Sequence, residues 1–274
     1  MKINMKKVLL VIIAVAIVVS AMIVVGVIVN ATSDVVLNIK ACNLSFSESI
    51  HIVYAVESKN VATSRIKMLY WTTPMEYESE YTLENAQYVS TTSYSQNVNG
   101  VVCRIFENEQ LWTKNMTDTL YARACVQVGD KTYYSDVERY SILEYVYNKM
   151  GYTGTATTNE NLLALLPEVL KYGADTQKYL EHNLENLPTD KYVKIFVDGG
   201  ILPDGMDYGF YKVGTVLTLR VDPENKANKA KWLDADGNVI KISETIEIIV
   251  GEDHTFYTAD PTVTTPTIPV LPSN

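Results

Sequence analysis

The chain has 274 residues, 47% of them hydrophobic, and its 32 acidic residues outnumber 23 basic ones, which gives a formal net charge of −9. This acidic balance disfavours nucleic-acid binding, which needs a basic footprint, and it disfavours adsorption to an anionic membrane surface. The length allows two domains with cores of their own.

The first predicted element is an apolar stretch behind a basic N-terminus. Residues 8–29 carry no charged side chain, and three lysines precede them. A helix of about 20 apolar residues crosses the hydrocarbon core of a bilayer, and lysines on one flank keep that flank inside. We therefore expect residues 1–30 to be a membrane anchor or an export signal. Its length favours a retained anchor, whereas residues 29–31 have the small-residue spacing of a cleavage site.

Residues 35–182 begin as a β module. Alternating apolar and polar residues predict half-buried strands at 35–41, 50–56, 66–71, 101–106 and 120–128. Gly129-Asp130 predicts a two-residue hairpin turn after the last of these. Short strands separated by turns predict a small antiparallel β-sandwich.

Helical spacing then replaces the alternation. Two Ser/Thr-x-x-Glu sequences, at 135–138 and 157–160, have the spacing of a capping box, in which two side chains satisfy the free amides of a new helix. The helices expected after them span 136–150 and 160–182. Pro167 lies inside the second helix and predicts a kink or a break, because its ring removes an amide hydrogen and clashes with the preceding turn.

A linker is expected at 183–190, followed by a second β unit at 191–259. Strand alternation returns at 193–197, 217–221 and 246–250. Over 260–274 the chain is rich in proline and threonine and has no hydrophobic period, which predicts an extended, stiff tail. The expected fold class is therefore mainly β with an α-helical insert (α+β).

Five elements follow one another in the second unit. They are Val193–Val197, Gly199-Gly200, Tyr211–Leu219, Lys231-Trp232 with Asp236–Val239, and a last β stretch that ends at Ala259. Their order and spacing resemble the B-repeat of internalin-type bacterial surface proteins. Lys229, Ala230 and the polar stretch 226–228 depart from that pattern. The resemblance implies a small β-grasp-like module with a spacer or adhesion role on bacterial surfaces and no catalytic chemistry.

A second set of residues links the first unit to a known context. It comprises Asp118, 121–123, 133–136, 140–141, 143–145, Leu170, 172–174, Gln177 and Tyr179. This set resembles a module that lies upstream of such repeats in uncharacterised secreted proteins of Gram-positive bacteria. The resemblance implies no activity.

Aromatic residues are the candidates for ligand contact. Five stand out in the first unit: Tyr70, Trp71, Tyr77, Tyr81 and Trp112. Exposed together on one face, they would form a platform on which sugar rings stack; packed inside, they would be core residues, which is the commoner role of large aromatics. Their exposure decides between the two readings.

Catalytic and metal-binding signatures do not occur in the sequence. It has neither G-x-S-x-G nor H-E-x-x-H, its three histidines stand far apart, and its cysteines form no C-x-x-C. Asp234–Asn238 shares part of a calcium-loop pattern but fits a hairpin turn better. Cys103 and Cys125 either pair or stay, with Cys42, as buried thiols. We expect no cofactor and no bound metal.

These observations together predict a non-catalytic extracytoplasmic surface protein that serves in adhesion or as a spacer. Its partners would be the membrane, through residues 8–29, and a cell-surface glycan or protein. It would sit in the cell membrane with an extracellular domain, or be secreted or wall-associated after cleavage. The alternative is a carbohydrate-binding module that uses surface aromatics, and a glycan-acting hydrolase is the least favoured function.

Overall fold

The computed structural model describes residues 35–46, 50–62, 65–108, 112–153, 155–225, 229–253 and 255–261. The anchor or signal expected at 1–30 and the tail beyond residue 261 lie outside these ranges. Within them, no helix combines the length and the apolar character needed to cross a membrane. The described chain is mainly β, with several antiparallel sheets and two α-helices, so the coarse fold class is confirmed.

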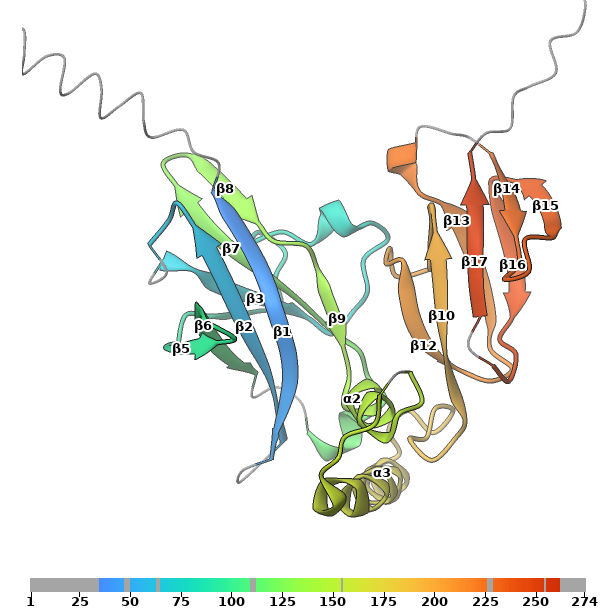
Figure 1. Cartoon of the computed structure of the whole chain (residues 1–274), viewed down its shortest axis with the longest axis horizontal. Helices are drawn as coiled ribbons and strands as arrows, with labels where there is room; N and C mark the ends of the chain where they lie inside the picture. Colours follow the sequence, from blue (N-terminus) through green and yellow to red (C-terminus); the bar gives the residue numbers. More distant parts are fainter. Residues whose placement is uncertain are drawn as a thin grey trace, which may run out of the picture.

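Two sheets make up the β part of the first unit (Figure 1). One has the strand order β1-β2-β6-β5, and the other has the order β4-β3-β7-β8 with β9 paired to β7. All of these pairs are antiparallel. The strands are β1 (Val36–Phe46), β2 (Ile50–Lys59), β3 (Lys67–Trp71), β4 (Tyr88–Ser90), β5 (Tyr94–Val98), β6 (Val101–Asn108), β7 (Leu120–Val128), β8 (Lys131–Tyr134) and β9 (Glu138–Tyr140). Short 3-10 turns, η2 (Glu78–Glu80) and η3 (Thr113–Asn115), lie between strands.

The main core of this unit lies between the two sheets. Alternate residues of each strand point inward, so one face of each sheet is buried. The inward residues include Ile52, Tyr54, Val56, Met68, Tyr70, Phe106, Ala122, Ala124 and Val126. The expected turn at Gly129-Asp130 joins β7 to β8.

The three cysteines of the chain are free thiols. Cys103 and Cys125 are buried and Cys42 is half-buried, which is typical of cysteines that act as small hydrophobic residues.

The first helix begins later than the sequence predicted. The helix expected over 136–150 is α2 (Ile142–Met150), and the residues before it form β9 against β7. Ser141 is the N-cap, because its hydroxyl accepts a hydrogen bond of 3.0 Å from the amide of Glu144. Ser135, the expected cap, instead accepts a 3.0 Å bond from the amide of Ala124 and fastens the chain to β7.

The second helix, α3 (Glu160–Tyr179), is a single continuous helix that ends three residues before the expected boundary at 182. Asn159 caps it by accepting a 3.1 Å bond from the amide of Leu162. Of the two outcomes expected at Pro167, the break into two helices is wrong, because the helix continues through this residue. Pro167 lies on the exposed face of the helix, where water can bind the carbonyl that the missing amide leaves free.

The second unit also contains two sheets, with the orders β12-β10-β17-β14-β15 and β11-β13-β16. Only β10 and β17 pair in parallel among the described strands of this unit. The strands are β10 (Tyr192–Asp198), β11 (Gly200–Ile201), β12 (Tyr208–Lys212), β13 (Val216–Val221), β14 (Ala230–Leu233), β15 (Val239–Ser243), β16 (Thr245–Ile249) and β17 (Thr255–Asp260), with a 3-10 turn η4 (Pro223–Asn225).

Trp232 is the centre of the second core. Its ring is fully buried, and its Nε1–H donates a 3.2 Å bond to the carbonyl of Ser243. Gly200 packs so closely that a Cβ atom there would lie 2.9 Å from the Trp232 ring and 2.8 Å from the carbonyl of Arg220. Glycine is therefore required for the close approach of β11 to this ring.

Replacing Trp232 tests whether this ring holds the second unit together. We expect Trp232→Ala to lower the free energy of unfolding by about 3–5 kcal/mol, since it removes a buried ring and leaves a cavity. Urea denaturation followed by circular dichroism measures the loss. Trp112→Ala is the matched control, because that indole is 63% exposed and its loss is expected to cost little. Equal losses of stability in Trp232→Ala and Trp112→Ala would contradict the central role of Trp232 in the second core.

Candidate functional site

The five aromatics proposed from sequence fall into three environments. Tyr70, Trp71 and Tyr81 are buried. Tyr77 is half-buried, with the guanidinium of Arg220 5.2 Å from its ring centre. Trp112 is exposed, and the only one of the five with a largely free ring.

These five rings do not form a common exposed platform, so the sugar-stacking surface predicted from them is wrong. Tyr70 and Trp71 are neighbours on β3 and therefore point to opposite faces of its sheet. The opposite sheet covers Tyr70, while Trp71 packs with Tyr81 in a second cluster on the other face. Because both faces of this sheet are covered, Tyr70, Trp71 and Tyr81 cannot form an exposed surface on which a sugar ring stacks.

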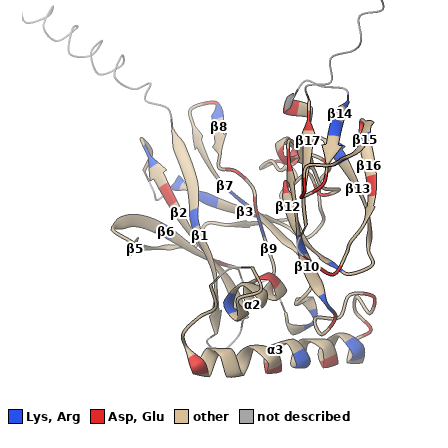
Figure 2. Ribbon diagram, turned by 45° about the vertical axis from the view of Figure 1, so that its right-hand side comes forward, with Lys and Arg blue, Asp and Glu red and all other residues tan. Residues whose placement is uncertain are grey.

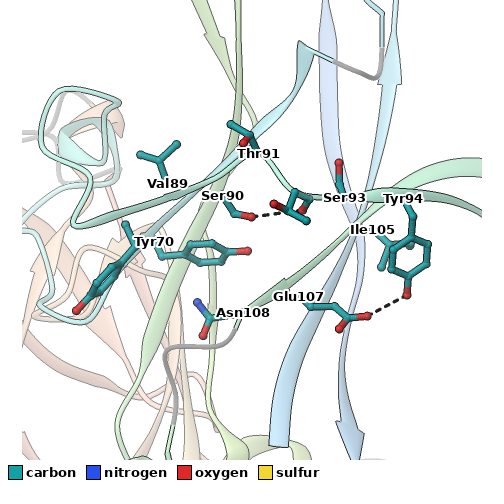
Figure 3. A pocket seen from close by; sticks show the side chains of 11 residues that line it. Tyr70, Val89, Ser90, Thr91, Ser93, Tyr94, Ile105, Glu107 and Asn108 are labelled. Atoms are coloured by element: carbon teal, nitrogen blue, oxygen red, sulfur yellow. Dashed lines mark hydrogen bonds between the residues drawn. The ribbon is translucent and has the colours of Figure 1, made fainter. Parts of the chain in front are cut away.

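One of the five, Tyr70, nevertheless lines a hollow of about 570 Å³ near the edges of β4 and β5 (Figure 3). We call it the tyrosine hollow. At this place the chain crosses from one sheet to the other through residues 91–93. The lining residues are Tyr70, Tyr88, Val89, Ser90, Thr91, Thr92, Ser93, Tyr94, Ile105, Glu107 and Asn108.

Hydrogen bonds fix several of these side chains. The hydroxyl of Tyr94 donates a 3.1 Å bond to Glu107 Oε1, which Figure 3 draws as a dashed line. The hydroxyl of Ser90 donates to the carbonyl of Thr92 at 3.4 Å. Ser93 Oγ accepts a 2.8 Å bond from Nε of Arg104. The wall of the hollow is therefore partly ordered before any ligand arrives.

Sequence reasoning missed most of this hollow. Of its residues it selected Tyr70 and passed over Tyr88 and Tyr94. The available signal was the segment Tyr88–Tyr94, in which two tyrosines flank a run of Val, Ser and Thr. That run lies at the edges of two sheets only because β4 and β5 are the outermost strands of their sheets.

A buried ion pair joins the two units. Nε of Arg139 lies 3.2 Å from Oδ2 of Asp204, and both side chains are almost completely buried. The hydroxyl of Tyr121 donates a hydrogen bond of 2.9 Å to the same carboxylate oxygen. A buried charge needs such partners, because removal from water costs several kcal/mol for each ion.

Contacts around the ion pair extend the junction. Arg220 of the second unit forms an ion pair with Glu76 of the first, and its Nη2 donates a 3.0 Å bond to the Glu76 carbonyl. Met206 packs in the cluster of Trp71 and Tyr81. Gly205, with φ +80°, lies in the turn between β11 and β12. This turn approaches the first unit so closely that a Cβ atom on Gly205 would lie 2.9 Å from the carbonyl oxygen of Glu76.

Helix α2 contributes an aromatic part of the junction. The Tyr147 ring lies edge-on to Tyr192 and Phe210, with centroids 6.2 and 6.1 Å away. Its hydroxyl donates to the carbonyl of Asp190 at 3.1 Å and accepts from the Tyr192 amide at 3.2 Å. The same Asp190 pairs with Lys212 at 2.8 Å, so the segment 183–190 is held at its end.

A second hollow, of about 890 Å³, opens between the units beside this junction. Phe196, Tyr208 and Phe256 form a row across three neighbouring strands on its wall, with ring centroids 5.7 and 6.1 Å apart. Its lining also carries the carboxylates of Glu78, Asp136, Asp198, Asp207, Asp222 and Glu224. Figure 2 shows that acidic and basic residues are interspersed over both units.

Two carboxyl groups near the junction have shifted ionisation. Burial raises the pKa of Glu144 to about 7, with Arg139 and Lys194 opposing the shift. Burial likewise raises the pKa of Glu138 to about 7. Neither residue lines one of the two hollows described above.

Metal ligands do not converge within the described residues, where no group of three His, Cys, Asp or Glu side chains could hold an ion. The carboxylate of Asp234 accepts bonds from the amides of Asp236 and Asn238 at 3.0 and 2.8 Å. These bonds lower the pKa of Asp234 and shape the turn between β14 and β15. The segment is therefore a hairpin turn, as the sequence indicated.

Removing one member of the buried ion pair tests the junction. Asp204→Ala is expected to lower the free energy of unfolding by about 3–5 kcal/mol, because it leaves the Arg139 charge buried without its partner. The double variant Arg139→Met/Asp204→Leu should recover most of that loss. Lys191→Ala, which breaks an exposed pair with Glu252, is the control and should cost under about 1 kcal/mol. A double variant as unstable as Asp204→Ala would contradict this account.

The stability of the protein should also depend on the charge of Glu144. Its pKa is raised in the folded state, so its ionisation removes stability progressively as the pH rises from about 4.5 through 7. Glu144→Gln should therefore stabilise the protein by about 3 kcal/mol at pH 8 and by almost nothing at pH 4.5. Thermal unfolding at both values measures this, with Glu168→Gln, an exposed helical position, as the control. A gain that is the same at both pH values would contradict the prediction.

Comparison of the chain with protein-family models, with curated proteins and with solved structures found no match. The resemblances of residues 191–259 to internalin-type B-repeats and of residues 35–182 to a secreted module therefore stay predictions from the sequence. Any functional conclusion depends on the geometry of the junction and of the two hollows.

Proposed function

We propose that this chain is a non-catalytic surface protein whose two β units act as one stiff spacer and carry an adhesive surface. The observation that supports the proposal most directly is the junction between the units. A spacer transmits position only when its units keep a fixed orientation. Inter-domain motion is the normal expectation unless the interface is large and well packed.

The contacts at the junction are of the kind that fix orientation. The Arg139–Asp204 pair is buried, and its carboxylate accepts a hydrogen bond from Tyr121. Because either charge buried alone would be strongly unfavourable, this pair favours the arrangement in which the two units bring both charges together. Aromatic packing around Tyr147 supplies the apolar part of the same interface.

The proposed fold family agrees with this role. The packing of two antiparallel sheets around one core supports a β-sandwich-like class for residues 35–182. In residues 191–259, the first and last long strands, β10 and β17, pair in parallel at the middle of their sheet. That arrangement supports a β-grasp-like module and, with it, the relation to surface repeats.

The proposed location follows from the sequence. Residues 8–29 are long and apolar enough to act as an anchor or export signal, and the chain would then be membrane-bound or released outside the cell. The contacts proposed for residues 35–261 are with cell-surface glycans or proteins.

Hydrolysis of glycans is less well supported. Such an enzyme needs two carboxyl groups that flank the substrate, one of them kept protonated. Of the acidic residues in the turn after β10, Asp204 is held by Arg139 and Tyr121, while burial raises the pKa of Asp207 beside the second hollow. Glu138 and Glu144 line neither hollow, and one perturbed carboxyl group beside the second hollow does not make an acid–base pair.

Distance measurements between the units test the spacer. Gln96→Cys and Lys241→Cys place spin labels at exposed positions of the first and second unit. We expect one narrow distance distribution in the full chain by double electron–electron resonance, because the junction fixes the orientation. Asp204→Ala in the same background should broaden it. A broad distribution in the unmodified junction would contradict a stiff spacer.

The same double variant tests the location. A membrane-impermeant maleimide applied to intact cells of the native host should label both introduced cysteines, whereas the three native ones are at least half-buried. Labelling only after the cells are lysed would contradict an extracytoplasmic position.

A further inference from the structure

The tyrosine hollow has a distinctive set of lining groups. Its eleven lining residues include three tyrosines, four serines or threonines, one carboxamide and one carboxylate. None of these described residues is a lysine, arginine or histidine. Most of the wall therefore consists of hydroxyl groups that both donate and accept hydrogen bonds, together with aromatic rings.

Two of the rings are open to solvent. Tyr88 is 43% exposed and Tyr94 is 49% exposed, and they belong to different sheets. Tyr94 is held by its bond to Glu107, so its ring is ordered without a ligand. An ordered ring loses little conformational entropy when a ligand packs against it.

Tyr70 adds a polar group that the fold itself does not use. Its side chain is only 2% exposed, and its hydroxyl has no hydrogen-bond partner within the described residues. Leaving a buried hydroxyl unpaired costs on the order of 1–3 kcal/mol. A ligand that enters the hollow and bonds this hydroxyl would remove that penalty.

The edges of the sheets supply further polar groups. β4 and β5 are both edge strands, so part of their backbone amides and carbonyls point away from their sheets. β4 has only three residues, which is short for the addition of a strand from another chain. These backbone groups suit a small ligand with many hydroxyls better than an extended peptide.

From this set of groups we infer that the tyrosine hollow binds a neutral saccharide of one or two sugar units. A sugar ring offers hydroxyls at its rim, which match Tyr70, Asn108 and the serine and threonine hydroxyls, and C–H faces, which pack on Tyr88 and Tyr94. An anionic ligand would find no cation on the wall, and the volume of about 570 Å³ lies in the usual range of small-molecule sites.

The saccharide site deepens the adhesive half of the proposed function and rests on it. It names the chemical class of the surface partner and places the contact on the first unit, away from the junction. The spacer half depends on Arg139 and Asp204, which do not line the hollow. An experiment can therefore disprove the saccharide site without disproving the spacer role, and the reverse also holds.

Direct binding to the full-length protein tests the site. The probes are glucose, galactose, mannose and N-acetylglucosamine as methyl glycosides, with the protein in a detergent that has no sugar headgroup. We expect at least one sugar to bind, as measured by saturation-transfer NMR and calorimetry. Tyr94→Ala should weaken that binding about tenfold or more, equivalent to about 1.4 kcal/mol.

Tyr70→Phe gives the sharper test, because it removes one oxygen and keeps the ring. It should weaken sugar binding about three- to tenfold while raising the midpoint of urea unfolding, since the unpaired hydroxyl is gone. Tyr54→Phe is the matched control: that neighbouring tyrosine is also buried but does not line the hollow, so sugar affinity should not change. Tyr179→Ala controls for the loss of an exposed ring.

Three results would overturn the proposal. The first is the absence of binding by every sugar of the panel at about 50-fold molar excess and above. The second is binding that neither Tyr94→Ala nor Tyr70→Phe weakens. The third is binding of a synthetic peptide of residues 262–274 but of no sugar, which would assign the sheet edges to the chain's own tail. In each case an unchanged spin-label distance would leave the spacer intact.

Discussion

The arrangement of this molecule depends on one buried ion pair, Arg139 with Asp204. Arg139 comes from β9 of the first unit, and Asp204 comes from the turn between β11 and β12 of the second. Neither charge can stay out of water unless the other is present, so each unit supplies the partner that the other requires. Beside this pair, Met206 and Tyr121 pack in one apolar cluster and Tyr147 packs in another. This junction is the basis of our proposal that the two units, each with its own core, act as one stiff body.

Tyrosine plays several roles that the sequence could not separate. The sequence has 19 tyrosines against 5 phenylalanines, and for the aromatic candidates it left two roles open, core packing and sugar contact. The structure adds a third role, in which hydroxyls bridge the two units: Tyr121 bonds Asp204, Tyr147 bonds the Asp190 carbonyl, and Tyr208 bonds the Arg139 carbonyl. A phenylalanine would fill the same volume but would leave the polar groups at the junction unpaired. The composition therefore reflects a polar interface between β units as much as a core.

The start of α2 shows why local signals were ambiguous. Two Ser-x-x-Glu sequences, beginning at Ser135 and at Ser141, have the same capping chemistry. The first lies next to a segment that can pair with β7, and this pairing extends the sheet and places Arg139 at the junction. Strand pairing with a distant segment is a tertiary choice, so the helix begins at the second sequence. The helix also continues through Pro167 without a break, because this residue lies on the exposed face.

The sequence by itself determined the mainly β class, most strand positions and the hairpin at Gly129-Asp130. These follow from alternation and turn chemistry, which act over a few residues. Only the tertiary structure decided which aromatics are exposed. Tyr70 and Tyr88 lie opposite one another on neighbouring strands, yet Tyr70 is buried and Tyr88 is exposed, because β4 is the edge strand of its sheet. It also brought together Arg139 and Asp204, which are far apart in the chain, since long-range contacts leave no periodic signal in the sequence.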